Sequence, residues 1–384
     1  MKVCLDLIEK RASTVEDPLA FPPLHDRIQE GCRSISVWLL PYLDHRCAVN
    51  SDSKKTKEYL DAAGQNSSEF ASRFRGALLG LALGDALGTT LEFSQRDSLP
   101  EVTSIIGGGP FGLRPGEWTD DTSMALCLAH SLIRNESFNY QDQLDLYCLW
   151  WKKGIFSSNG RCFDIGNTVV DALNRYMQTG DAYSGSTDPM AAGNGSLMRL
   201  APVVLFYFSD PDSCVEWCAE SSKTTHGAKE AVDACRYLGA LLHGAIKGVS
   251  KVELTQGLYE PYPNFWNDAP LSLAIQNVAV EACRKSRDKI RSSGYVVHTL
   301  EAAIWAFHNT DTFEEGAILA ANLGDDADTV AAVYGQLAGA YYGEYQINPL
   351  WIKKLSYFHV FYIYADRLRR FGLCRTPSFV RVER

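Results

Sequence analysis

The sequence predicts an all-α fold. Apolar residues recur at helical spacing from residue 73 onward, whereas β-branched runs with alternating polarity are scarce. Two rows of glycines spaced by four residues support this prediction, because residues four apart share one face of a helix. The rows are Gly76, Gly80, Gly84 and Gly88, and Gly335, Gly339 and Gly343. Glycine weakens an isolated helix, so such rows favour close helix-to-helix approach, and the two rows could pack on one another.

The other expected helices follow from apolar periodicity and from breaks at glycine and proline. They cover residues 122–134, 142–153, 166–178, 213–222, 228–247, 271–284, 298–308, 313–322 and 350–370. A further helix is expected to start at the aspartate-rich segment that precedes the second glycine row. The segments between these helices are loops, where we expect the functional groups.

The first 70 residues differ from the rest of the chain. Residues 17–26 contain three prolines and cannot form a helix interior, and residues 50–70 are polar and linker-like. Between them, residues 28–43 could form a short amphipathic helix. We therefore expect an N-terminal arm at residues 1–70 and a globular domain at residues 71–375.

Composition excludes several classes of protein. The chain has 384 residues and a formal net charge of −9, which gives no support to nucleic-acid binding. The apolar run at residues 76–88 is too short to span a bilayer, and Asp85 interrupts it. The 11 cysteines are scattered and contain no CxxC pair, so we expect reduced thiols rather than disulfides or a zinc site. The N-terminus lacks a signal-peptide core. We expect a soluble, cytoplasmic protein.

Two acidic clusters of the same form are the strongest chemical signal. They are Thr119, Asp120 and Asp121, and Asp326, Asp328 and Thr329, each at the start of an apolar helix. For either cluster alone, helix capping is the ordinary explanation. Together they favour a site for hard divalent cations, which bind oxygen ligands and would offset the repulsion between carboxylates. Mg²⁺ or Mn²⁺ fits better than Zn²⁺, because no His or Cys lies near either cluster.

Other polar features are weak signals on their own. Glu92 follows the first glycine row and, by itself, is most simply a surface residue. Glycine-rich segments at residues 157–168 and 191–203 could present backbone N–H groups to phosphate oxygens, although neither matches a P-loop or a dinucleotide fingerprint. His226 starts a helix, where a lone histidine more often caps or packs than binds a ligand.

Taken in order over roughly residues 71–350, these segments resemble the ADP-ribosylglycohydrolase family. The matching stretches are "GALLGLALGDALGTTLEF", "GEWTDDTSMAL", "NGRCFDIGNT", "GNGSLMRLAPV", "THGAKEAV" and "GDDADTVAAVYGQLAGAYYG". The resemblance implies an orthogonal bundle of helices around a binuclear Mg²⁺ or Mn²⁺ centre. It makes residues 71–375 a catalytic domain that hydrolyses the bond between ADP-ribose and a protein side chain, with the arm as an extension outside it.

The resemblance also implies roles for individual residues. The two acidic clusters would supply the metal ligands, with Asp325 outside the ligand set. Glu92 would lie beside the metals and act in catalysis. Asp164 would lie close to the scissile ribose, which favours an arginine-linked substrate over a serine-linked one. The implied ADP-ribose contacts are Asn159, Gly160, Arg161, Gly193, Asn194, Gly195, Ser196 and His226.

Two alternatives concern the role of the whole chain and of its arm. A catalytically silent relative would keep the fold as a binding or structural protein, but the complete acidic set argues against that. Some family members protect bacteria from ADP-ribosyltransferase toxins, with an N-terminal extension that blocks the toxin. The arm at residues 1–70 could bind such a toxin, or it could dock on its own core.

Overall fold

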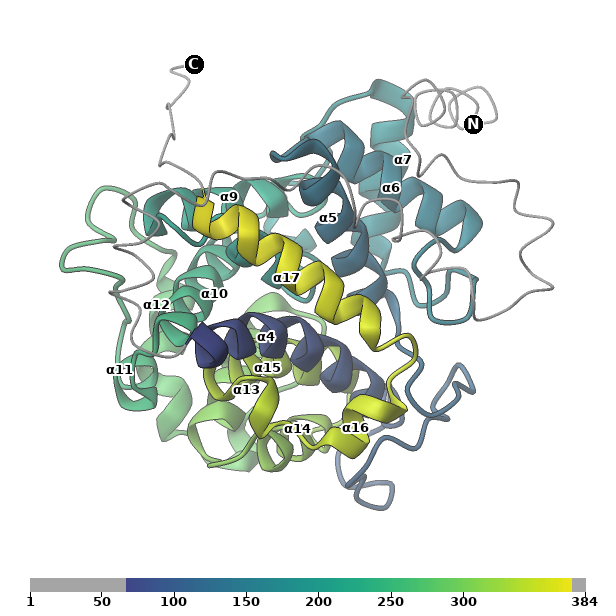
Figure 1. Cartoon of the computed structure of the whole chain (residues 1–384), viewed down its shortest axis with the longest axis vertical. Coiled ribbons are helices and arrows are strands. Elements are labelled where there is room, and N and C mark those ends of the chain that lie inside the picture. Colours follow the sequence, from purple (N-terminus) through teal and green to yellow (C-terminus); the bar gives the residue numbers. More distant parts are fainter. Residues whose placement is uncertain (1–66, 375–384) are drawn as a thin grey trace.

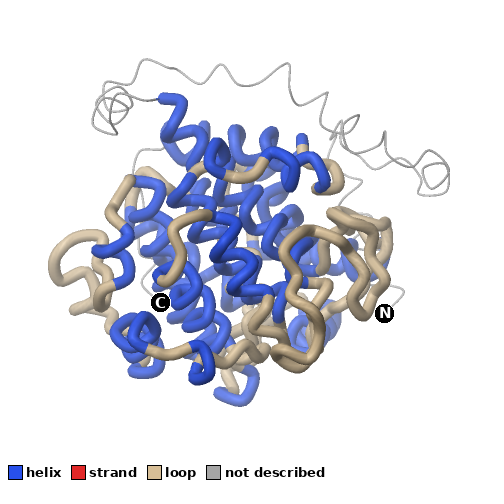
Figure 2. The backbone as a smooth tube through the Cα atoms, turned by 90° about the horizontal axis from the view of Figure 1, so that it is seen from below, coloured by secondary structure: helices blue, strands red, loops and turns tan. Residues whose placement is uncertain are grey.

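The structure is a computed structural model that describes residues 67–374, and it confirms the predicted all-α class. Figure 2 shows helices joined by loops, and no strand occurs among the described residues. The long α-helices are α4 (Ser67–Gly88), α5 (Asp120–Asn135), α6 (Tyr140–Lys153), α7 (Asn167–Thr179), α9 (Pro211–Lys223), α10 (Lys229–Lys247), α12 (Leu273–Glu281), α13 (Val296–His308), α14 (Phe313–Ala321), α15 (Ala327–Tyr342) and α17 (His359–Cys374).

Shorter helices occupy several connections. They are α8 (Ala201–Phe206), α11 (Lys251–Thr255), α16 (Pro349–Lys354), and the 3-10 helices η2 (Pro189–Ala191), η3 (Ala282–Arg284), η4 (Arg287–Lys289) and η5 (Glu344–Gln346). Helix α4 begins at Ser67, ahead of the predicted start at residue 73. The predicted arm lies outside the described residues as far as residue 66, and so does the short helix predicted at residues 28–43.

The two glycine rows pack against one another, as their spacing allowed. Helices α4 and α15 run antiparallel with their backbones in contact: a Cβ on Gly80 would overlap the carbonyl oxygen of Gly335, and one on Gly76 would overlap that of Gly339. The same contact repeats at each turn toward Gly88, which lies against the first residues of α15. Figure 1 shows α4 lying across α15 at the centre of the molecule. The end of α4 is therefore fixed beside the start of α15.

The other helices surround this central pair. Helices α13 and α14 pack on α15, while α17 packs on α4 and lies above it in Figure 1. Arg75 of α4 binds two carboxylates: its Nε and one outer nitrogen donate to Asp366 of α17 at 2.9 and 2.8 Å, and its other outer nitrogen donates to Glu344 of η5 at 2.9 Å. A guanidinium that forms a fork with one carboxylate fixes orientation as well as distance. The packing of α17 on α4 is held in this way.

The single helix predicted over residues 350–370 is wrong. Helix α16 ends at Lys354 and α17 begins only at His359. In the intervening turn, the N–H of Ser356 donates to the carbonyl oxygen of Gly116 at 2.9 Å, and a Cβ on Gly116 would overlap the carbonyl oxygen of Lys354. The break is set by a loop that is distant in sequence, so no local pattern marks it.

The long connection between α4 and α5 contains no helix and is anchored by Arg96. The Arg96 guanidinium donates to three backbone carbonyl oxygens, those of Leu323 at 3.0 Å, Arg287 at 2.7 Å and Ile290 at 2.5 Å. Leu323 lies on the segment that leads into α15, whereas Arg287 and Ile290 lie in and just after η4, ahead of α13. The loop that carries Glu92 is thereby tied to the loop that carries the second acidic cluster.

Two features of the described residues bear on the environment of the chain. No helix in residues 67–374 is both long and apolar enough to cross a bilayer. The seven cysteines from Cys127 to Cys283 are free thiols.

Candidate metal centre

Neither acidic cluster acts as an ordinary helix cap. Thr119 is the N-cap residue of α5 and Asp326 is that of α15, yet neither side chain accepts a capping hydrogen bond from its own helix. Within α15, Asp328 accepts only from the N–H of its neighbour Thr329, at 2.8 Å. Capping therefore does not explain why these residues stand at the two helix starts.

Asp85 caps α5 from the neighbouring helix α4, a role that the sequence reasoning missed. Its Oδ1 accepts from the N–H and hydroxyl of Thr119 at 2.9 and 3.0 Å, and its Oδ2 accepts from the N–H and hydroxyl of Thr122 at 3.1 and 2.6 Å. Burial raises the pKa of Asp85 to about 6, and these bonds oppose that rise. In the sequence, this role is indicated only by the position of Asp85, a lone carboxylate inside a glycine- and alanine-rich helix.

The two clusters meet where α5 and α15 begin. The hydroxyl of Thr119 lies 3.3 Å from Oδ2 of Asp328 and 3.4 Å from Oδ2 of Asp121. The hydroxyl of Thr329 lies 3.4 Å from the same oxygen of Asp121. Asp120 is buried in the same region, with a pKa raised first by burial and then by neighbouring carboxylates. Segments far apart in the sequence thus form one acidic, oxygen-lined centre.

Asp326 lies at the edge of this centre and Asp325 lies outside it. Asp326 is half-buried, and its Oδ2 accepts from the side-chain amide of Asn194 at 2.6 Å. The side chain of Asp325 is exposed, and its backbone is left-handed, with a φ of 58°. Asp325 contributes through its backbone, because its carbonyl oxygen accepts from the N–H of Phe93 at 2.7 Å.

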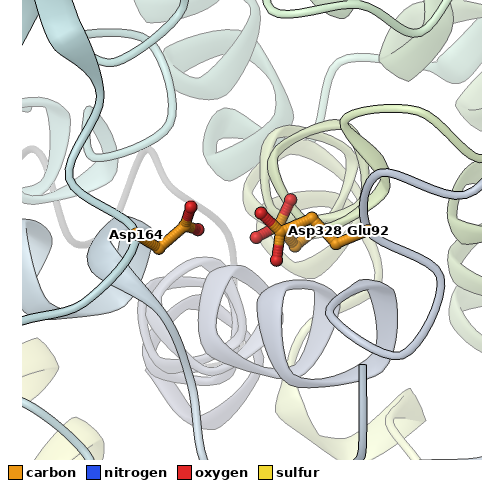
Figure 3. Close-up of side chains that lie close together, drawn as sticks. All are labelled: Glu92, Asp164 and Asp328. Atoms are coloured by element: carbon orange, nitrogen blue, oxygen red, sulfur yellow. The ribbon is translucent and has the colours of Figure 1, made fainter. Parts of the chain in front are cut away.

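Glu92 and Asp164 reach the centre from two separate loops. One carboxylate oxygen from each of Glu92, Asp164 and Asp328 lies within 4.8 Å of the other two. In Figure 3 the carboxylate of Asp164 points across the site toward Glu92 and Asp328. Asp164 has a φ of 59°, a left-handed conformation that few residues other than glycine adopt. Such spacing suits carboxylates that share a cation.

These carboxyl groups cannot all be ionised without a compensating charge. Burial, followed by the charges of Asp328 and Asp164, raises the pKa of Glu92 to about 12. Burial also raises the pKa of Asp164 to about 7, and it raises the pKa values of Asp120, Asp121 and Asp328 well above the ordinary range. Among the described residues, Oε2 of Glu92 and Oδ1 of Asp121 are buried without a hydrogen-bond partner. This donor set fits hard divalent cations.

The segment from Gly193 to Gly195 packs on His226. A Cβ on Gly195 would lie 2.9 Å from Cε1 of the His226 ring, and one on Gly193 would lie 3.4 Å from Nε2. The ring is buried, with Nδ1 at 2.8 Å from the hydroxyl of Thr225. Burial lowers the pKa of His226 to about 3, so the ring is neutral. Asn194 links this segment to the acidic centre through Asp326.

The remaining predicted ADP-ribose contacts lie in different environments. The hydroxyl of Ser196 is buried and hydrogen-bonded to that of Ser222 at 2.8 Å. Asn159, Gly160 and Arg161 form an exposed turn, in which the side chain of Asn159 accepts from the N–H of Arg161 at 3.1 Å. That turn comes shortly before Asp164 in the chain.

Arg199 supports the glycine segment from inside the protein and was not predicted. It is fully buried, and its guanidinium donates to the carbonyl oxygen of Gly195 and to the hydroxyl of Thr225, each at 2.8 Å. The guanidinium carbon also lies 4.7 Å from the centre of the Tyr147 ring. An arginine between apolar residues, as in "LMRLAPV", was the signal in the sequence.

Comparison with known proteins identifies the family of this chain. The sequence profile described as ADP-ribosylglycohydrolase matches residues 66–376. The chain belongs to the ADP-ribosylglycohydrolase family. A solved structure titled "ADP-ribosylglycohydrolase-related protein complex" matches 79% of this chain and 99% of its own chain, with 42% identity and a TM-score of 0.69.

Curated relatives within the ADP-ribosylglycohydrolase family include two that are named for an activity. "ADP-ribosylarginine hydrolase Tri1" from Pseudomonas putida (strain GB-1) is 47% identical over 285 residues, which is 74% of either chain. "ADP-ribosyl-[dinitrogen reductase] glycohydrolase" from Rhodospirillum rubrum is 33% identical over 297 residues, covering 74% of this chain and 90% of that protein. The acidic centre therefore belongs to an enzyme of a glycohydrolase family.

Proposed function

We propose that this ADP-ribosylglycohydrolase removes ADP-ribose from modified arginine side chains of proteins, with the help of two divalent cations. The observation that carries the proposal is that Glu92 and Asp164 lie beside the two Thr-Asp clusters. One carboxylate oxygen from each of Glu92, Asp164 and Asp328 lies within 4.8 Å of the other two. The arginine linkage is supported by the 47% identity to a protein named ADP-ribosylarginine hydrolase.

The proposed cation ligands are the six residues at the starts of α5 and α15. They are Thr119, Asp120, Asp121, Asp326, Asp328 and Thr329. Their carboxylate and hydroxyl oxygens suit Mg²⁺ or Mn²⁺. When bound, such cations would neutralise the carboxylates, orient the ribose hydroxyls and lower the pKa of water.

Glu92 and Asp164 are the proposed proton carriers, because they face the centre from loops outside both clusters. The oxygen of a water bonds to C1″ of the ribose as the bond from C1″ to the guanidino nitrogen breaks. One of the two carboxylates takes a proton from this water, and the departing nitrogen receives a proton, which leaves ADP-ribose and arginine. Burial raises the pKa of Asp164 to about 7 before any cation is bound, and adjacent cations would favour the ionised form that accepts a proton.

The glycine-rich segments are proposed to hold the phosphates and ribose of ADP-ribose. The residues assigned to this role are Asn159, Gly160, Arg161, Gly193, Asn194, Gly195, Ser196 and His226. His226 is neutral and buried under the glycines, so its contribution is to the shape of the segment rather than to charge. Asn194 is suited to align the ligand with the cations, since it already binds Asp326.

We also propose that the arm at residues 1–70 binds a protein partner, an ADP-ribosyltransferase toxin in the cytoplasm. The family profile begins at residue 66, so nearly all of the arm lies outside the part shared with the family. Deletion of the arm should abolish toxin binding and leave hydrolysis intact. Toxin binding that survives the deletion would overturn this part of the proposal. Loss of folding would overturn it as well, because it would show that the arm packs on the core of its own chain.

The proposed reaction is tested with ADP-ribosyl-arginine and ADP-ribosyl-serine peptides, each with Mg²⁺, with Mn²⁺ and with a chelator. We expect release of ADP-ribose from the arginine peptide only when metal is present. Asp121→Ala and Asp326→Ala should each abolish that release. Full activity of both variants, or full activity in chelator, would exclude the metal-dependent reaction, and preference for the serine peptide would exclude the arginine assignment.

A further inference from the structure

Three phenylalanines form a cluster beside the acidic centre. Phe93 contacts Phe111 edge-on, with ring centres 6.4 Å apart, and Phe111 contacts Phe163 at 5.1 Å. Phe93 directly follows Glu92 and Phe163 directly precedes Asp164. The aromatic cluster therefore accompanies the two carboxylates that approach the centre from separate loops.

Packing of the protein core does not account for Phe93. Its side chain is 66% exposed, and its backbone has a φ of 59°, which is rare for a bulky residue. Two backbone hydrogen bonds hold it there: the N–H of Phe93 donates to Asp325 at 2.7 Å, and the N–H of Asp325 donates to Ser94 at 2.8 Å. A strained conformation that displays an aromatic ring at a candidate active site points to a function for that ring.

Phe111 joins the other two rings from a third segment. It lies near the tip of the glycine-rich loop that starts at Gly107, whose carbonyl oxygen accepts from the hydroxyl of Thr90 at 2.9 Å. A Cβ on Gly109 would overlap the carbonyl oxygen of Thr89, so the tip packs directly on the start of the Glu92 loop. Phe111 is half-buried in this position. The three rings thus belong to one surface built from three loops.

We propose that the cluster of Phe93, Phe111 and Phe163 binds the guanidinium group of the ADP-ribosylated arginine, and so sets the preference for that linkage. The inference rests on the proposed function, because it names the part of the site that receives the leaving group. A guanidinium is planar, cationic and weakly hydrated, and it stacks on aromatic faces. The adjacent carboxylate of Asp164 supplies the complementary charge.

The location of the cluster favours the guanidinium over the adenine ring, which also stacks on aromatic groups. One of the two proposed phosphate segments contacts the centre through Asn194, which binds Asp326. Adenine lies beyond the phosphates, whereas the guanidinium is bonded to C1″, where Glu92 and Asp164 are proposed to act. An aromatic surface next to those two residues therefore faces the leaving group.

The test compares Phe93→Ala, Phe93→Leu and Phe93→Tyr, with Phe358→Ala as a matched control. Phe358 is also partly exposed and makes edge-on ring contacts, but it lies on the turn before α17. For each folded variant, with Mg²⁺ present, we would measure kcat and KM on an ADP-ribosyl-arginine peptide. Binding of free ADP-ribose would be measured by titration calorimetry.

Loss of cation–aromatic contact predicts a KM raised about 3- to 30-fold in Phe93→Ala and Phe93→Leu. Phe93→Tyr and Phe358→Ala should remain close to the wild type, and the Kd of ADP-ribose should stay unchanged throughout. An unchanged KM in Phe93→Ala, or a normal KM in Phe93→Leu, would overturn the inference. A Kd for ADP-ribose weakened by the same factor as KM would overturn it in favour of adenine. A wild-type protein that does not hydrolyse the arginine peptide would instead overturn the proposed function.

Discussion

Asp85 and Thr119 are joined twice, because Oδ1 of Asp85 accepts both the N–H of Thr119, at 2.9 Å, and its hydroxyl, at 3.0 Å. The same hydroxyl lies 3.3 Å from Oδ2 of Asp328, but its single proton can be donated to only one acceptor. When the proton is directed to Asp85, the lone pairs of the hydroxyl face the acidic centre. Asp85 thus prepares Thr119 to act as an oxygen ligand.

Asp85→Asn should weaken metal binding without removing any proposed ligand. The amide nitrogen cannot accept a hydrogen bond, so the bonds to Thr119 or those to Thr122 are lost and the start of α5 is released. Groups that orient metal ligands typically contribute about 10- to 100-fold to affinity. We expect the affinity for Mn²⁺ to decrease by a factor in this range, as measured by titration calorimetry on the folded variant.

Asp325→Asn is the matched control for this prediction. It removes the same formal charge close to the same centre, but its side chain is exposed and stands outside the cluster. The affinity for Mn²⁺ should change by less than about threefold, since exposed charges are strongly screened. Equal losses in the two variants would mean that net charge, rather than orientation of Thr119, governs binding.

Gly80→Ala should destabilise the protein despite the higher helix propensity of alanine. The new Cβ would overlap the carbonyl oxygen of Gly335, so α4 and α15 would have to separate. Overpacking of this kind typically costs about 1–3 kcal/mol, more than the roughly 1 kcal/mol gained from propensity. Urea unfolding should show a lower midpoint at an unchanged slope.

Gly166→Ala provides the comparison for that substitution. No heavy atom would lie within 4 Å of the added Cβ, and Gly166 has a φ of −65°. Its free energy of unfolding should stay within about 0.5 kcal/mol of the wild type. A loss as large as that of Gly80→Ala would show that the contact between α4 and α15 is not the cause.

Metal should stabilise the protein more at high pH than at low pH. In the metal-free state, burial raises the pKa of Asp85 to about 6 and that of Asp164 to about 7. A carboxyl group whose pKa is raised in the folded state ionises more readily in the unfolded state. The free energy of unfolding therefore decreases as the pH rises from about 4 through the folded-state pKa. Cations bound beside these groups favour their ionised forms and reverse this loss. The Tm gain in millimolar Mg²⁺ should be at least about 2–4 °C larger near pH 8 than near pH 5, and a gain independent of pH would contradict the assignment.

His243 should contribute to acid sensitivity independently of the metal centre. It is buried beside Phe208, whose carbonyl oxygen accepts from Nε2 at 3.1 Å, and burial lowers its pKa to about 4. A histidine with a lowered folded pKa favours the unfolded state as the pH falls below its ordinary value near 6.5. This group alone should remove about 2 kcal/mol between pH 6.5 and pH 5. Urea unfolding of His243→Gln at both values should show a smaller decrease than the wild type, and an equal decrease would contradict the prediction.

Local patterns in the sequence predicted most of the helices and a close helix contact at each glycine row, while the pairing of the two rows was only one possibility. Residues spaced by four share one face of a helix, whatever the surrounding structure. The rows that contain Gly80 and Gly335 therefore indicated both a helix and a closely packed neighbour. The two Thr-Asp clusters were recognisable because they repeat one pattern at two helix starts. Their repetition weakened the capping explanation, and the geometry of Thr119 and Asp326 removes it.

Features that depend on distant contacts could not be predicted in the same way. Gly116 breaks the expected helix at residues 350–370 only because the fold brings it to Lys354. The role of Asp85 depends on the placement of α5 against α4, and a single sequence does not contain that placement. Asp164 was assigned to the site only through the resemblance to a family, because its neighbours in the sequence do not indicate a buried carboxylate.

The antiparallel contact of α4 with α15 also has a consequence for the order of biosynthesis. Thr119 and Asp328, which this contact brings together, are 209 residues apart in the chain. A ribosome completes α4 well before α15, so the glycine face of α4 stays uncovered until α15 has been made. Closing so long a loop is entropically unfavourable and slows folding. No chain that lacks α15 can assemble the acidic centre, because Asp326 and Asp328 stand at the start of that helix.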